Sequence, residues 1–162
     1  MLRTLYRKLI FIYIILAIAG FTLLSTVGSH MVEDSLISSV STSLYREATQ
    51  IAANQGNLYY HDERSLTDLY HSLNSLASYH NSQIWLISTD GQILLNTTAA
   101  LDEEHPEELT GFDPVALGSQ YYSIGTFFDH FDDKMLSVMV PVTSNLRIKG
   151  YVAIHLSLQN VY

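Results

Sequence analysis

The chain has 162 residues, with 8 Lys and Arg against 16 Asp and Glu, and a formal net charge of −8 at pH 7. This acidic balance excludes nucleic acid as a partner class, because nucleic acid recognition depends on cationic contacts to phosphate. The absence of cysteine excludes a disulfide framework. The 11 Tyr, 6 Phe and single Trp argue against an intrinsically disordered chain.

An apolar segment near the N-terminus indicates attachment to a membrane. Arg3, Arg7 and Lys8 precede it, and no charged residue lies between Lys8 and Glu33. A helix of about 20 residues is long enough to cross the hydrocarbon core. Because basic flanks stay inside, residues 1–8 are predicted to be cytoplasmic, 9–28 a transmembrane helix in the cell membrane, and 29–162 extracytoplasmic.

A cleaved signal peptide is the alternative for this segment. Its apolar core would have about 7–15 residues, and this one is longer. The sequence Val27-Gly28-Ser29 is also a poor cleavage site, because it lacks the small-x-small pattern. An uncleaved anchor is therefore predicted.

Helical periodicity continues beyond the apolar segment. One stripe has a spacing of three or four residues and comprises Val32, Leu36, Val40, Leu44, Ala48 and Ile51. We expect a long helix that ends near Gln55-Gly56-Asn57 and packs on its own domain, on a second copy, or on both. A second helix is predicted from the capping-box spacing Ser65-Leu66-Thr67-Asp68 up to about Tyr79.

The remainder of the chain is typical of antiparallel strands. Residues 83–88 and 92–96 flank Thr89-Asp90-Gly91, which is a hairpin signal. An acidic crossover, residues 99–119, is expected to be a loop with room for one short helix. Three further strands are predicted at 121–128, 134–143 and 147–157. The predicted fold class is α+β, with the long helix packed on a five-stranded antiparallel sheet.

Two segments of this pattern resemble a known family. Residues 84–93, an apolar strand running into Asp90-Gly91, look like the first hairpin of extracytoplasmic PAS-like sensor domains, the single Cache domains. Val140-Pro141-Val142 followed by Lys149-Gly150-Tyr151-Val152 resembles the closing strand pair of that family. The resemblance covers residues 1–157 and rests on the order and spacing of these motifs.

The resemblance implies a place in a larger receptor. Such domains are followed by a second membrane span and, most often, a HAMP linker and a histidine kinase that phosphorylates a protein histidine with ATP; a chemoreceptor or cyclase output is the alternative. Those parts would lie beyond Tyr162. Residues 1–162 contain no catalytic motif, so no enzyme activity and no cofactor are expected in this part.

The resemblance also implies a ligand pocket between the sheet and the crossover. The predicted lining consists of semi-polar side chains. Four lie on the last two strands, one lies near the crossover and one on the first strand: Ser137, Met139, Tyr151, His155, Tyr122 and Trp85. The alternative is that these residues are ordinary core and surface. A parallel homodimer is implied as well, and the stimulus is an unknown small molecule, cation or peptide.

The acidic crossover is a second candidate site. Its carboxylates could hold Ca²⁺ or Mg²⁺, or attract a cationic peptide: Asp102, Glu103, Glu104, Glu107 and Glu108. A solvated loop is favoured, because the run lacks the spaced acids and the turning glycine of a cation loop. The rival to a receptor is a membrane-anchored extracytoplasmic interaction module without a small-molecule ligand.

Overall fold

The structure is a computed structural model that describes residues 2–102, 105–115 and 121–160. The chain divides into two units, Met1–Ser38 and Ser39–Tyr162. The first unit consists of the N-terminal part of helix α1 (Leu2–Ile51). Within it, Tyr6–Leu24 is one helical segment long and apolar enough to cross a membrane, and none of it is buried. An N-terminal apolar helix is thus confirmed, close to the predicted range 9–28.

Helix α1 is followed directly by a π-helical turn, Ala52–Gly56, and by the short helix α2 (Asn57–Tyr60). The expected stop at Gln55-Gly56-Asn57 is therefore wrong, because Gly56 has helical backbone angles, φ −62° and ψ −41°. A Cβ on Gly56 would lie 2.9 Å from Cγ2 of Val142, so glycine at this position allows the helical backbone to approach the sheet closely.

Helix α3 (Leu66–His80) begins at the predicted capping residue. The hydroxyl of Ser65 accepts a hydrogen bond from the Asp68 amide at 3.1 Å and donates to the Asp68 carboxylate at 2.8 Å. Asn81 ends the helix with a left-handed backbone, φ 50°. Leu69, Leu73 and Ala77 form its buried stripe.

The sheet is antiparallel and has six strands in the order β3-β2-β1-β6-β5-β4. Their bounds are β1 Gln83–Ser88, β2 Gln92–Asn96, β3 Glu107–Glu108, β4 Tyr122–Gly125, β5 Met135–Ser144 and β6 Arg147–Ser157. The α+β class is confirmed and the count of five strands is wrong. The additional strand, β3, lies in the acidic crossover, and the described part of that crossover contains no helix.

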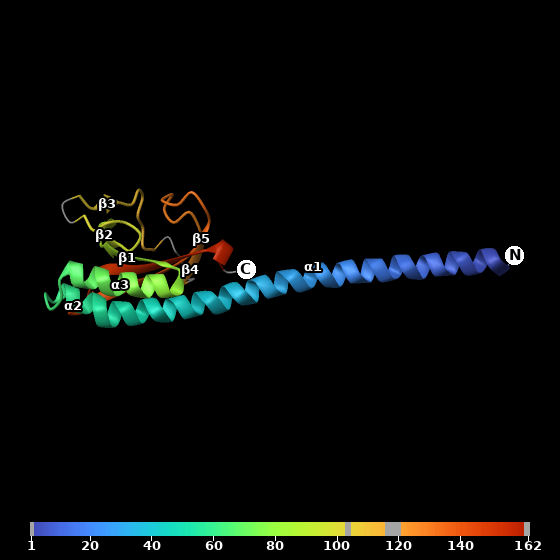
Figure 1. The fold of residues 1–162 in the computed structure, drawn as a ribbon, viewed down its shortest axis with the longest axis horizontal. Coiled ribbons are helices and arrows are strands. Elements are labelled where there is room, and N and C mark those ends of the chain that lie inside the picture. Colours follow the sequence, from blue (N-terminus) through green and yellow to red (C-terminus); the bar gives the residue numbers. More distant parts are fainter. Residues whose placement is uncertain (1, 103–104, 116–120, 161–162) are drawn as a thin grey trace. The chain divides into compact units, whose positions relative to one another are not determined.

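Both faces of the sheet are covered. Helix α3 and the last part of α1 lie along one face, and the segments that contain β3 and connect β4 to β5 lie over the other (Figure 1). Accordingly, β6 is buried without interruption from Gly150 to Leu156. The face of β6 that the sequence marks as semi-polar is therefore core as well, and this is the face on which the candidate site is built.

Candidate ligand site on the sheet

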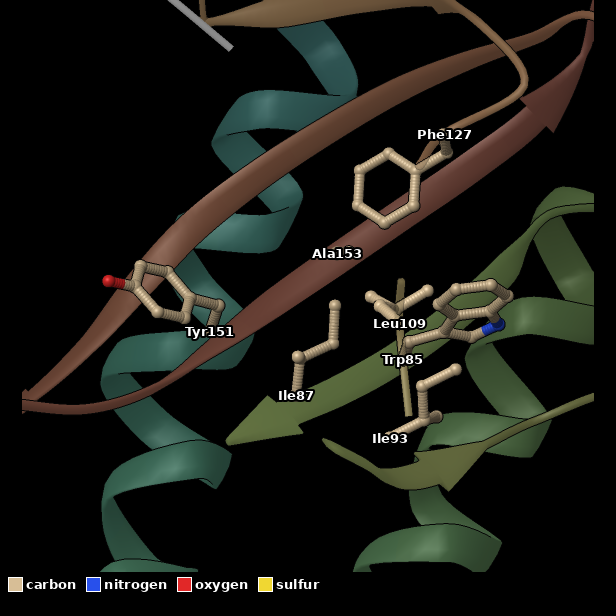
Figure 2. Close-up of a cluster of buried hydrophobic side chains, with 7 residues drawn as sticks. All are labelled: Trp85, Ile87, Ile93, Leu109, Phe127, Tyr151 and Ala153. Carbon is tan, nitrogen blue, oxygen red and sulfur yellow. The ribbon is translucent and has the colours of Figure 1, made fainter. Parts of the chain in front are cut away.

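Strand register brings five of the six predicted ligand residues onto one face. Trp85 of β1 is paired with Ala153 of β6, and His155 lies two residues further along β6 on the same face. Ser137 is paired with His155, Met139 with Ala153 and Tyr151 with Ile87. The loops above the sheet close over this face, as Figure 2 shows for Phe127 and Leu109. The predicted face thus exists, and it is filled by the protein's own side chains.

Tyr122 lies on the opposite face. It is paired with Val138 in β5, and Val138 is paired with Ile154 on the side that faces the helices. Its ring packs on Tyr121, with ring centroids 5.6 Å apart. Tyr122 was expected to line the pocket together with Trp85 and His155, and this placement is wrong. Alternate residues of a strand point to opposite faces, so a difference of one position moves the side chain to the other face.

His155 is the central polar residue of the site. It is fully buried, and its Nδ1 lies 2.8 Å from the hydroxyl oxygen of Ser137. Burial, and to a smaller extent the neighbouring His130, lower the pKa of His155 from 6.5 to about 3. The imidazole is therefore neutral near pH 7, and its Nε2 has no hydrogen-bond partner among the described residues.

Trp85 lies against His155 and has an unpaired polar atom of its own. The two ring centroids are 4.4 Å apart, and the indole Nε1 is buried without a partner in the described part of the chain. Leaving a buried donor or acceptor unpaired costs about 1–3 kcal/mol. Two such atoms in adjacent side chains are unusual in a core, and together they form a place where a polar ligand group would gain hydrogen bonds.

The aromatic cover of this face was not part of the predicted site. Phe127 and Phe131 pack on His155 with ring centroids 4.4 and 5.0 Å away, and His130 packs on Trp85 at 4.7 Å. Nδ1 of His130 is also 3.5 Å from Oε1 of Glu107. The signal in the sequence is the aromatic run at residues 127–131, which contains three phenylalanines.

Tyr151 and Met139 occupy the other end of the same face. The ring of Tyr151 packs against Phe112 at 5.7 Å, and burial raises the pKa of its hydroxyl. Met139 is partly buried beside the cluster. These residues give the site a mainly apolar wall, with the polar atoms concentrated at Trp85, His155 and Ser137.

The acidic residues do not form a compact ligand set where the structure describes them. Asp102 is next to His105, with 3.8 Å between Oδ1 and Nδ1, whereas Glu107 faces His130. Glu108 is exposed in β3, and Glu103 and Glu104 lie outside the described residues. Within the described ranges no three His, Asp or Glu residues are grouped to hold a metal, so the cation site stays a prediction.

A groove between α1 and α3 is a further hollow, with a volume of about 420 Å³. Its walls are polar and include Arg46, Glu47, Asn54 and His80. Nε2 of His80 lies 3.3 Å from Oε1 of Glu47, which ties the two helices together. This groove is therefore interpreted as a solvated interface between the two helices.

No family model and no curated sequence matches this chain. Solved structures do: the extracellular domain of vpHK1S-Z8, described as a histidine kinase, has a TM-score of 0.57 and 15% identity. The sensor domain of the V. cholerae histidine kinase DctB has a TM-score of 0.55 and 15% identity. The ligand-binding domain of the Campylobacter jejuni chemoreceptor Tlp3, solved with L-valine, has a TM-score of 0.51 and 11% identity.

These structures define the fold class. The matches cover 77%, 79% and 78% of this chain but only 53%, 54% and 56% of the solved chains, so this chain spans about half of their length. The fold is that of extracellular sensor domains of histidine kinases and chemoreceptors, as the resemblance to Cache domains predicted.

Proposed function

We propose that this chain is the extracytoplasmic sensing region of a membrane-bound bacterial receptor, and that the parent protein is a two-component histidine kinase. The sensor-domain fold, similar to the domains of vpHK1S-Z8 and DctB, is the observation that carries the proposal. The apolar helical segment Tyr6–Leu24 supports membrane attachment. Arg3 before this segment, and Arg7 and Lys8 at its start, support an inside N-terminus.

The stimulus site in this proposal is the face that carries Trp85, Ser137, Met139, Tyr151 and His155. Its apolar wall with a few converging polar atoms is the composition of small-molecule sites. The unpaired Nε1 of Trp85 and Nε2 of His155 are groups that a ligand would satisfy. A ligand that binds one packing of this face more tightly than another would shift the balance between the two.

The output in this proposal is movement of helix α1. The π-helical turn and α2 pack on β5, and the helix runs without interruption from Leu2 to Ile51. A change in the sheet would therefore be passed along one helix. In the full receptor, inserting one residue near Ser29 would rotate the following helix by about 100°, and we expect signalling to change. Unchanged signalling would contradict transmission through a rigid helix.

A chemoreceptor parent is the second candidate, favoured by the similarity to the Tlp3 domain. An interaction module without a ligand is the third, favoured by the filled aromatic face. The first two share a ligand site, and the third does not, so ligand binding is the decisive measurement.

The experiment is a thermal-shift screen of the full chain in detergent micelles. L-Valine and L-isoleucine are the first probes, because Tlp3 domains were solved with them, followed by organic acids and divalent cations at several pH values. A ligand at one hundred times its Kd adds about 2.7 kcal/mol of stability. Trp85→Phe should weaken a positive response and Tyr122→Phe, on the other face, should not. No response to any probe would support the interaction module.

A further inference from the structure

Two buried polar atoms of the aromatic face have no hydrogen-bond partner among the described residues, and the loop between β4 and β5 covers them. Nε1 of Trp85 and Nε2 of His155 belong to fully buried side chains. The covering loop is residues 126–131, between β4 and β5, and Phe127 is drawn beside Trp85 in Figure 2. Phe131 also contacts Trp85, with ring centroids 5.1 Å apart. The loop thus fills the place that a ligand would take.

The backbone of this loop is strained. Phe127, Phe128 and Asp129 have φ values of 42°, 54° and 56°, three successive left-handed residues without a glycine. This conformation is unfavourable for any L-residue with a Cβ, and bulky residues rarely adopt it. Such strain persists where surrounding contacts hold it, and it is concentrated at ligand clamps and switch regions.

The contacts that hold the loop closed lie at its margins. The Phe131 amide donates to the Thr126 carbonyl at 2.9 Å, and the Thr126 hydroxyl donates to the Asp129 carboxylate at 3.1 Å. Phe128 packs on Phe112, with centroids 5.3 Å apart. His130 reaches Glu107 on the edge strand β3, and the Glu107 side chain is 63% exposed. All of these contacts can be released without breaking the central strands.

We propose that residues 126–131 form an aromatic lid that occupies the stimulus site of the unliganded chain, and that it opens locally to expose Trp85 and His155. This rests on the proposed function for the identity of the site. The incoming molecule must offer an acceptor for the indole Nε1–H and an apolar part to replace the rings of Phe127 and Phe131. Opening relieves the three left-handed residues, which lowers the free energy that the ligand must supply.

The single tryptophan makes the lid directly measurable. In the full chain in detergent micelles, hydrogen exchange of the one indole N–H can be followed by NMR beside the backbone amide of Ile154 in the core of β6. If the lid opens locally, the indole proton, corrected for intrinsic rate, exchanges at least tenfold faster than the Ile154 amide and responds little to urea. Equal protection with equal urea dependence would mean opening by global unfolding only, and would overturn the lid.

A matched pair of variants tests the strain. In a Thr126→Val background, where the hydrogen bond from Thr126 to Asp129 is already absent, Asp129→Gly removes only the cost of one exposed left-handed residue, so indole exchange should slow about five- to thirty-fold. Asp132→Gly, in the same connection and equally exposed but without a positive φ, should not slow it. Equal effects of the two substitutions would refute strain as the opening force.

Quenching by acrylamide gives a second readout that does not depend on the ligand. Phe131→Ala should raise the quenching constant of Trp85 several-fold in protein that still unfolds cooperatively. Leu73→Ala, in the buried stripe of α3 on the other face of the sheet, should leave it unchanged. Unchanged quenching in Phe131→Ala would also overturn the lid. Failure of every probe in the thermal-shift screen would count against the proposed sensing function alone, so the two proposals fail separately.

Discussion

At the scale of single residues, Gly150 is the position where the sheet leaves least room. It lies in β6 between Ser88 of β1 and Val142 of β5. A Cβ there would lie 2.6 Å from the carbonyl oxygen of Ile87 and would overlap the hydroxyl of Tyr60. The backbone on one side and a tyrosine with a buried hydroxyl on the other cannot both move aside.

We therefore expect Gly150→Ala to lower the free energy of unfolding by about 1–3 kcal/mol, the usual cost of overpacking a core. Gly125→Ala is the control, because no atom lies within 4 Å of its added Cβ. Urea denaturation followed by Trp85 fluorescence measures both. Similar stabilities of the two variants would show that the sheet accommodates the methyl group.

His155 makes stability depend on pH. Its pKa is about 3 in the folded protein and 6.5 when unfolded, because burial and then His130 disfavour the charged imidazole. The unfolded chain thus binds the proton first, so this contribution is complete above pH 6.5 and is lost as the pH falls from 6.5 towards 3. The loss is about 1.4 kcal/mol per pH unit within that window.

Urea unfolding at pH 7.5 and 4.5 tests this expectation. The wild type should lose about 2–3 kcal/mol more than His155→Gln, whose side chain can keep a hydrogen bond to Ser137 without titrating. The acidic residues titrate in both proteins and cancel in the comparison. A pH response that is the same in both would rule out His155 as its source.

The sequence allowed three residues of the candidate site to be placed on one face of the sheet. Trp85, Ser137 and His155 share a face because strict alternation in β5 and β6 fixes their direction. Tyr122 could not be placed, since β4 has only four residues and a slip of one residue reverses its faces. Phe127 and Phe131 were missed because, although the aromatic run is visible in the sequence, no glycine signals the left-handed turn at residues 127–129 that places it over the sheet.

At the scale of elements, the contact between the π-helical turn and β5 decides where the helix ends. Glycine after an apolar stripe is typical of a helix stop, which is why a boundary was expected at Gly56. The structure instead uses Gly56 to bring the helix against Val142, which is fully buried. A tertiary contact of this kind cannot be read from local sequence. The strand β3 was missed for a similar reason, because its two glutamates pair with β2 through backbone atoms alone.

A double-mutant cycle tests this contact. Gly56→Ala alone should destabilise the protein, because the new methyl group meets a stiff β-branched side chain at 2.9 Å. In a Val142→Ala background the same change should stabilise by up to about 1 kcal/mol, since alanine favours helix over glycine. Chemical denaturation of the four proteins gives the coupling energy. Additive effects would mean that Gly56 and Val142 do not constrain one another.

At the scale of the whole molecule, the division at Ser38 predicts an independent domain. Residues 39–162 contain all six strands and the described core. We expect this segment, expressed alone, to remain soluble without detergent and to unfold in one cooperative transition with a buried Trp85. Circular dichroism and fluorescence during heating check this. Non-coincident transitions, or aggregation at neutral pH, would show that the preceding helix is needed for folding.

The α+β class, the hairpin at Gly91 and the three late strands were predictable, because each depends on local periodicity and turn chemistry. The order of the sheet was not, because it depends on which distant strands meet. Here β1 is paired with β6 in the centre, and neither strand signals this in its own residues.

The central pairing of β1 with β6 determines how late during translation the sheet can form. Among the strands, β1 is synthesised first and β6 last. Until β6 has been synthesised, the edge of β1 that carries Trp85 and Ile87 and later pairs with β6 has no hydrogen-bonding strand beside it. The hydrophobic interior closes only when residues 147–157 have emerged. Formation of the native core is therefore postponed until nearly the whole chain has been synthesised.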